Sequence, residues 1–142
     1  DHINLFPENP LRGKNYEELG PRFPAMTEAY DKKLVALADQ IGTEKSLRLM
    51  HGVYIGTPGP TFETPAEYEY FRIIGGDAVG MSTVPEVIVA NHAGMRVFGL
   101  SVITDLGGKD ITEVPTHEEV QKAAIKAQPT VEAIVKEMVA RC

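Results

Sequence analysis

Residues 77–82, Asp-Ala-Val-Gly-Met-Ser, are the stretch that most constrains the fold, because this short run is nearly all apolar. A strand of this composition has no polar face, which is typical of a strand covered on both sides in a parallel sheet. Helix signals precede and follow it along the chain. Strands that alternate with helices predict an α/β fold with a mainly parallel, twisted central sheet flanked by helices.

Capping boxes mark the starts of three expected helices. In such a box a Ser or Thr and a Glu three residues later each accept a hydrogen bond from the other's backbone N–H group. The boxes begin at Thr64, Thr83 and Thr116. The expected helices cover residues 27–42, 65–75, 85–93 and the chain from 117 towards its end, and the expected strands cover 47–56, 77–82 and 96–104. Pro129 should kink or interrupt the last helix.

Composition narrows the class of protein. A chain of 142 residues is long enough for one domain with a hydrophobic core, and its formal net charge of −6 without a basic stripe argues against a nucleic-acid partner. The single cysteine, Cys142, excludes a disulfide framework and makes a reducing cytoplasm the expected location. No apolar run approaches the roughly eighteen residues that span a bilayer, so no membrane partner is expected. No residue spacing suggests a metal site.

Side chains with binding chemistry stand where the expected strands end. Phe62 and Glu63 come just before a capped helix, which fixes where they point. An aromatic ring beside an acceptor-only carboxylate suits a flat heterocycle, which the ring stacks on and whose N–H protons the carboxylate accepts. Four further residues follow later strands, namely Met81, Ser82, Thr104 and Asp105. Since ligands of parallel sheets bind beyond the carboxyl ends of the strands, these residues predict one pocket.

Each of these residues also has an ordinary structural interpretation. Phe62 and Met81 are common core fillers, and Glu63 is an ordinary solvated residue before a helix. Ser82 can be a helix cap, and Asp105 is a normal turn residue ahead of two glycines. His117 follows a cap residue and is equally consistent with simple exposure.

Three motifs, taken together and in this order, resemble those of a known family. They are Gly-Pro-Thr-Phe-Glu-Thr at 59–64, Gly-Met-Ser-Thr-Val-Pro-Glu-Val at 80–87 and Thr-His-Glu-Glu-Val at 116–120. With them the chain resembles the trimeric, low-molecular-mass class of purine nucleoside phosphorylases. The resemblance covers only the C-terminal half of that family's chain. Residues 1–142 are therefore expected to be the C-terminal half of a single nucleoside phosphorylase domain whose N-terminal half is absent, with an incomplete three-layer α/β/α fold.

The resemblance implies reversible phosphorolysis of purine ribo- or deoxyribonucleosides to free base and ribose 1-phosphate, as in purine salvage. Inorganic phosphate is then the co-substrate, and no cofactor or metal is expected. Phe62 is similar to the residue that stacks on the purine, and Glu63 to the carboxylate that accepts from N1–H and the 2-amino group. Met81 resembles the residue beneath the ribose, and Tyr54 is similar to a residue near a ribose hydroxyl. Thr104 is expected among the substrate-binding residues.

The remaining implied roles concern phosphate, the sugar and the oligomer. Ser82 is similar to a phosphate ligand, and His117 to a catalytic histidine at the 5′-hydroxyl. Phe23 resembles an aromatic residue that covers the site of a neighbouring subunit, which implies a homotrimer. No Arg or Lys lies near the motif at 80–87, so the N-terminal half is expected to supply the cations for phosphate. We therefore expect the 142 residues alone to be inactive.

Asp105 departs from the family, which usually has Asn there to read O6 and N7 of a 6-oxopurine. A deprotonated Asp would repel O6 and accept from a 6-amino group, whereas a protonated one can serve as the general acid at N7. Relatives that cleave methylthioadenosine carry Asp there but lack a counterpart of Glu63. Because Glu63 is present, inosine and guanosine are the expected substrates. The alternatives are a phosphorylase of methylthioadenosine or adenosine, and a non-catalytic nucleoside-binding fragment.

Overall fold

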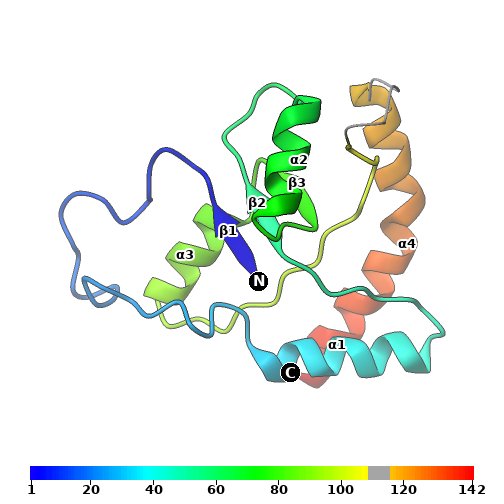
Figure 1. Ribbon diagram of the computed structural model, residues 1–142. Coiled ribbons are helices and arrows are strands. Elements are labelled where there is room, and N and C mark those ends of the chain that lie inside the picture. The colour runs from blue at the N-terminus through cyan, green and yellow to red at the C-terminus, as the bar shows by residue number, and fades with distance from the viewer. Residues whose placement is uncertain (109–115) are drawn as a thin grey trace.

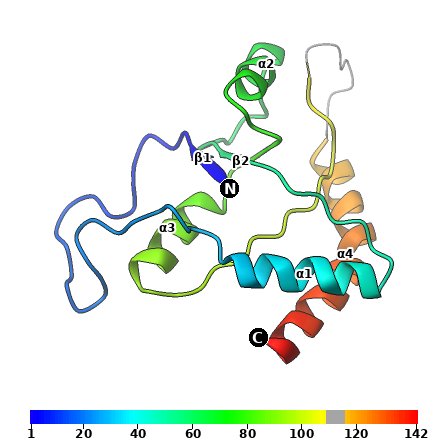
Figure 2. The same ribbon diagram turned by 60° about the horizontal axis from the view of Figure 1, so that its bottom comes forward.

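A computed structural model describes residues 1–108 and 116–142 (Figures 1 and 2). The elements of this part are β1 His2–Asn4, α1 Lys32–Glu44, β2 Tyr54–Gly56, α2 Pro65–Ile73, β3 Ala78–Gly80, α3 Val84–His92 and α4 His117–Arg141. The three strands form one parallel sheet in the order β1-β2-β3, with Ile55 of β2 opposite Ile3 and Val79. The expected α/β fold with a parallel sheet is confirmed. No helix in the described ranges is long and apolar enough to cross a membrane.

The sheet and α3 share one group of buried side chains. Ile55 and Val84 are fully buried, and Val84 packs so closely on Gly56 that a side chain at that glycine would collide with it. Gly76 is constrained in the same way by the side chain of Ile55. The contact of Val84 with Gly56 fixes the carboxyl end of β2 relative to the start of α3, and the contact of Ile55 with Gly76 fixes the entry into β3.

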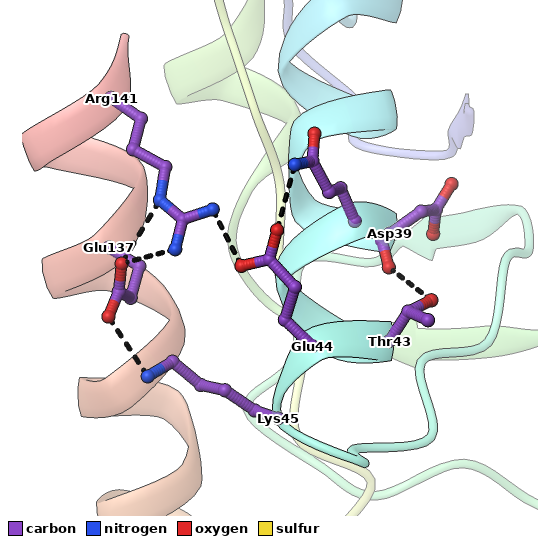
Figure 3. Close-up of polar contacts among 7 residues, drawn as sticks. Asp39, Thr43, Glu44, Lys45, Glu137 and Arg141 are labelled. Atoms are coloured by element: carbon purple, nitrogen blue, oxygen red, sulfur yellow. Dashed lines mark hydrogen bonds and ion pairs between the residues drawn. The ribbon is translucent and has the colours of Figure 1, made fainter.

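A second hydrophobic core holds α1 against α4, apart from the sheet (Figure 1). Its buried residues are Ala38 and Ile41 of α1 and Ile134 and Met138 of α4. A network of ion pairs also joins α4 to the C-terminal end of α1 (Figure 3). Arg141 of α4 reaches Glu44 of α1 at 2.7 Å, and Lys45, just beyond α1, reaches Glu137 at 3.0 Å.

The strands differ from the sequence prediction. β2 and β3 each keep only three residues of the runs predicted at 47–56 and 77–82. The predicted strand at 96–104 is wrong: the segment forms no strand and is largely exposed, with Ile103 at 60%. An apolar run becomes a strand only beside a partner backbone, and the segment pairs with neither edge of the described sheet. Within this segment the carbonyl of Val97 accepts a backbone hydrogen bond from the Asp31 N–H at 2.8 Å.

The helices follow the predictions more closely, with two corrections. α1 begins at Lys32 rather than at 27, because the carboxylate of Asp31 accepts the N–H groups of Lys33 and Leu34 and caps the helix there. Of the kink or interruption predicted at Pro129, the interruption is wrong, since α4 runs unbroken from His117 to Arg141 (Figure 1), and the kink stays a prediction. Beyond the proline, Ile134 and Met138 of α4 pack against α1, and this packing stabilises the last turns of the helix.

Candidate functional site

A cavity of about 870 Å³ runs along β3, between α2 and the segment 102–108, and residues 76–81 form part of its lining. It brings together five of the residues selected from the sequence, namely Phe62, Glu63, Met81, Thr104 and Asp105. Residues 63, 81 and 105 come from three segments that are distant in the chain. Five of the six residues predicted to share one pocket therefore line one cavity, whereas Ser82 does not line it. The roles of the individual residues stay predictions.

The start of α2 sets the position of Glu63. Thr64 caps the helix in a complete box: its hydroxyl accepts the Glu67 N–H at 3.2 Å, and the Glu67 carboxylate accepts the Thr64 N–H at 2.7 Å. Pro65 occupies the first helical position, where its missing N–H costs nothing. Glu63 thus stands directly before a rigid helix start, half-buried at the cavity wall.

Two hydroxyl groups hold the carboxylate of Glu63. Thr57 donates to Oε1 at 3.2 Å, and Tyr68 donates to Oε2 at 3.3 Å. Sequence reasoning missed both residues. Thr57 directly follows β2, so the rule on strand ends could have included it, and Tyr68 sits one helical turn after the Thr64 cap.

The carboxylates of Glu63 and Asp105 both lie close enough to Tyr68 to affect its pKa. Burial raises the pKa of its hydroxyl to about 12, and the carboxylates of Glu63 and Asp105 add to the rise. The phenol is therefore protonated at neutral pH and acts as a donor. Asp105 itself is exposed and accepts the hydroxyl of Thr104 at 2.7 Å. This wall of the cavity offers acceptors, which suits a ligand edge that carries N–H groups.

Phe62 and Met81 supply apolar surface. Their exposed fractions are 45% and 40%, so neither is a core residue and the core interpretation does not hold. The side chain of Met81 lies against Gly59, where any side chain would collide with its sulfur. Exposed apolar groups beside fixed polar ones are the usual lining of a small-molecule site.

The turn from β3 into α3 is strained. Thr83 has φ 72° and ψ −57°, and the Val84 N–H donates to the Ser82 carbonyl at 2.8 Å, which together define a γ-turn of the rare kind. The predicted capping box at Thr83 is wrong, because no side-chain cap bond forms. With this backbone the Thr83 hydroxyl instead meets the hydroxyl of Ser82 at 3.2 Å. Strained residues of this kind cluster at functional sites.

Tyr54 and Ser82 lie next to each other, but they are not among the described residues that line the cavity. The Tyr54 hydroxyl lies 3.4 Å from both the backbone nitrogen and Oγ of Ser82. It also lies against Gly80, where a side chain would collide with it. The two candidate ribose and phosphate residues therefore form one polar group at the end of the sheet.

His117 and Phe23 are not brought to the cavity. His117 is exposed at the start of α4 and lies 3.0 Å from Gln121, although Val120, one turn further along, does line the cavity. Residues 109–115, which join segment 102–108 to α4, lie outside the described part. Phe23 is 87% exposed and borders a separate cavity of about 430 Å³. Both assignments stay predictions.

The charges that line the cavity do not favour an anion or a metal. Arg72, the one cationic side chain among the described lining residues, is paired with Glu69 at 2.8 and 3.1 Å. Across residues 1–108 and 116–142, no group of three or more His, Cys, Asp or Glu side chains could hold a metal ion. The described site can therefore recognise a neutral ligand with N–H donors better than it can hold a phosphate.

Comparisons with known proteins agree with this geometry. Residues 1–140 match the sequence model of the phosphorylase superfamily. Purine nucleoside phosphorylase 1 of Bacillus subtilis is 47% identical over 99% of this chain and 52% of its own. The structure of Schistosoma mansoni purine nucleoside phosphorylase with adenosine superposes with a TM-score of 0.95 at 37% identity, over 99% of this chain and 53% of that one. The Schistosoma enzyme with guanosine gives 0.94 at 38%, over 99% and 53%.

The alignments cover nearly all of this chain but only part of each relative. The chain spans about half the length of the curated relatives it matches. The family is assigned on a sequence identity of 47% to a curated relative and on a family match over residues 1–140. The chain belongs to the phosphorylase superfamily.

Proposed function

We propose that this chain supplies the base- and ribose-binding part of a purine nucleoside phosphorylase. The observation that carries the proposal is the carboxylate of Glu63, held at both oxygens and facing one cavity with Phe62, Met81 and Asp105. Relatives named as purine nucleoside phosphorylases at 47–49% identity support it. The reaction is reversible phosphorolysis, which gives a free purine and ribose 1-phosphate as in purine salvage.

The residues divide the chemistry between them. Phe62 stacks on the purine, and Glu63 accepts its N1–H and 2-amino protons. Cleavage of the glycosidic bond leaves negative charge on the base, and Asp105 is the proposed general acid that meets this charge at N7. Met81 and Tyr54 contact the ribose, His117 its 5′-hydroxyl, and Thr104 supports Asp105 through its hydrogen bond.

Phosphate binding needs groups beyond those described at the cavity. Ser82 lies at the strained turn into α3, where a helix start favours an anion, but a dianion also needs cations. We propose that these cations come from the part of the relatives' fold that this chain does not span. The active form is then a cytoplasmic homotrimer in which Phe23 covers the site of a neighbouring subunit.

The preferred substrates are inosine and guanosine, since a carboxylate at Glu63 matches the N1–H of a 6-oxopurine. Asp105 favours the alternative, a phosphorylase of methylthioadenosine or adenosine, because a carboxylate there accepts a 6-amino group. Rates of the full-length protein on inosine and methylthioadenosine, with and without phosphate, test both. Faster turnover of methylthioadenosine would overturn the preference. Binding of the base without phosphate-dependent turnover would overturn the enzyme itself and leave a nucleoside-binding module.

A Glu63→Gln variant tests the observation behind the proposal. The amide turns an N–H donor towards the purine edge and removes the charge, so a charge-assisted hydrogen bond is lost. We expect kcat/KM for inosine to fall about 10- to 100-fold, the equivalent of a hydrogen bond to a charged group. Glu67→Gln is the matched control, because glutamine can keep the capping box and Glu67 does not line the cavity. Equal rates for Glu63→Gln and Glu67→Gln would contradict the assigned role.

A further inference from the structure

Tyr68 is tied to Glu63 by the architecture of the helix start. Glu63 immediately precedes the Thr64 cap, and Tyr68 is the fourth residue of the helix. Residues at these two positions face each other across the first turn, where many helices carry an apolar pair. In this chain the pair is polar, and the Tyr68 hydroxyl donates to Oε2 of Glu63 at 3.3 Å.

The ring of Tyr68 also contacts the loop that carries Asp105. Gly107 lies against ring atoms Cε1 and Cζ, so that any side chain there would collide with the ring. Tyr68, Glu63, Asp105 and Gly107 all line the same cavity. One residue of α2 therefore touches both carboxylate-bearing walls of the candidate site.

The hydrogen bond from the Tyr68 hydroxyl limits how many further donors the Glu63 carboxylate can accept. A carboxylate has about four lone-pair positions, two on each oxygen. Thr57 occupies one on Oε1 and Tyr68 one on Oε2, which leaves one on each oxygen. Two neighbouring acceptor positions match two neighbouring N–H donors. Guanine offers such a pair in N1–H and its 2-amino group, whereas hypoxanthine offers N1–H alone.

We infer that Tyr68 is a positioning residue that sets base selectivity by holding the Glu63 carboxylate in the orientation that accepts two adjacent N–H groups. The inference rests on the proposed function and deepens it, since it names the feature of the substrate that the site reads. Tyr68 does not act on the reacting atoms. It acts through Glu63, and its loss changes binding of the base rather than bond cleavage.

Kinetics of the full-length protein with guanosine and inosine test the inference. Tyr68→Phe keeps the ring on Gly107 and removes only the hydroxyl. We expect the KM for guanosine to rise about 10-fold and that for inosine about threefold or less, because the second donor loses its fixed acceptor. We expect kcat to stay within about twofold, as for a contact made equally in ground and transition states. Tyr70→Phe is the matched control on the same helix, since Tyr70 is half-exposed and does not line the cavity.

The outcomes separate the inference from the function beneath it. If the unchanged protein cleaves neither nucleoside with phosphate, the proposed function fails and the inference with it. If the unchanged protein is active and Tyr68→Phe behaves like Tyr70→Phe, only the inference fails. An equal rise in KM for both nucleosides, or a fall in kcat, also overturns it, because either result describes general structural support rather than selection of a base edge.

Discussion

Thr64 and Thr83 each directly precede a helix, and each is followed by a proline within two residues. Thr64 has an extended backbone at φ −73° and caps its helix, whereas Thr83 sits at φ 72° and caps nothing. The Thr64 start is rigid and positions Glu63. The Thr83 start holds a γ-turn that presents Ser82 beside Tyr54. Two threonines in similar sequence thus serve the site in different ways.

Substitution by alanine separates these two roles. Thr64→Ala removes the acceptor of the Glu67 N–H and should lower the free energy of unfolding by about 1 kcal/mol. Thr83→Ala removes no cap bond, so its cost should stay within about 0.5 kcal/mol. Urea unfolding of both variants, followed by circular dichroism, measures the difference. Equal losses would show that Thr83 caps α3 in solution.

The residues of the cavity could be predicted from the sequence where chain position alone fixes them. Phe62, Glu63, Met81, Thr104 and Asp105 follow expected strands or precede a cap, and the topology carries them to one place. The partners of Glu63 could not be predicted in this way. A hydroxyl at 57 or 68 is ordinary in any sequence, and its meaning comes only from the side chain it meets across the cavity wall.

At the scale of elements, the helices were more predictable than the strands for a physical reason. A cap and an apolar stripe are local, and two of the three predicted capping boxes form as expected. A strand depends on a neighbouring backbone that may lie far along the chain. Residues 96–104 have the composition of a buried strand, but no backbone in the described part pairs with them as a strand. Their exposure is therefore a property of the surroundings and not of the segment.

The ion pairs between α1 and α4 make the packing of this helix pair depend on pH (Figure 3). Hydrogen bonds from Lys45 and then Arg141 hold the pKa of Glu137 below its ordinary value of 4.5. A lowered carboxyl pKa stabilises the fold fully above the ordinary value, and the contribution disappears as pH falls through the folded one. Glu137→Gln should therefore lower the melting temperature at pH 7, by a small amount because these side chains are about one-third exposed.

A pH series distinguishes this network from ordinary surface pairs. The difference in melting temperature between Glu137→Gln and the unchanged protein should shrink as pH falls from about 7 to about 3. Glu132→Gln is the matched control, because Glu132 is half-exposed and its ion pair among the described residues runs along α4 to Lys136. Its effect should be smaller at pH 7. A Glu137→Gln effect that is constant across the series would show that the side chain acts by packing and not by charge.

At the scale of the whole molecule, the exposed surface is large for the mass. The accessible area is 9990 Å² for 15.5 kDa, whereas a compact monomer of this mass exposes about 7,200 Å². The excess of about 2,800 Å² on this one chain is above the roughly 1,000–2,500 Å² that each partner buries in an obligate interface. Large apolar side chains contribute to it on α2 and on the segment after α3, with Ile73 at 70% and Leu106 at 74% exposed. Leu106 lines the candidate site, so part of this exposed apolar surface adjoins the place where the proposed phosphorolysis needs further groups.

The isolated 142-residue chain should therefore behave as an open molecule. We expect it to enhance the fluorescence of anilinonaphthalene sulfonate under native conditions, because contiguous exposed apolar surface binds the dye. We expect it to elute ahead of a compact protein of 15.5 kDa in size-exclusion chromatography and to show no phosphorolysis. Replacing Ile103 and Leu106 by glutamine should reduce the dye signal, since both side chains are more than half exposed. Ile103 lies in the segment 96–104, which has no strand partner in the described part, and Leu106 lies two residues beyond it. Compact elution without dye binding would mean that the chain closes over its own apolar surface in solution, and the site would then need no further cover.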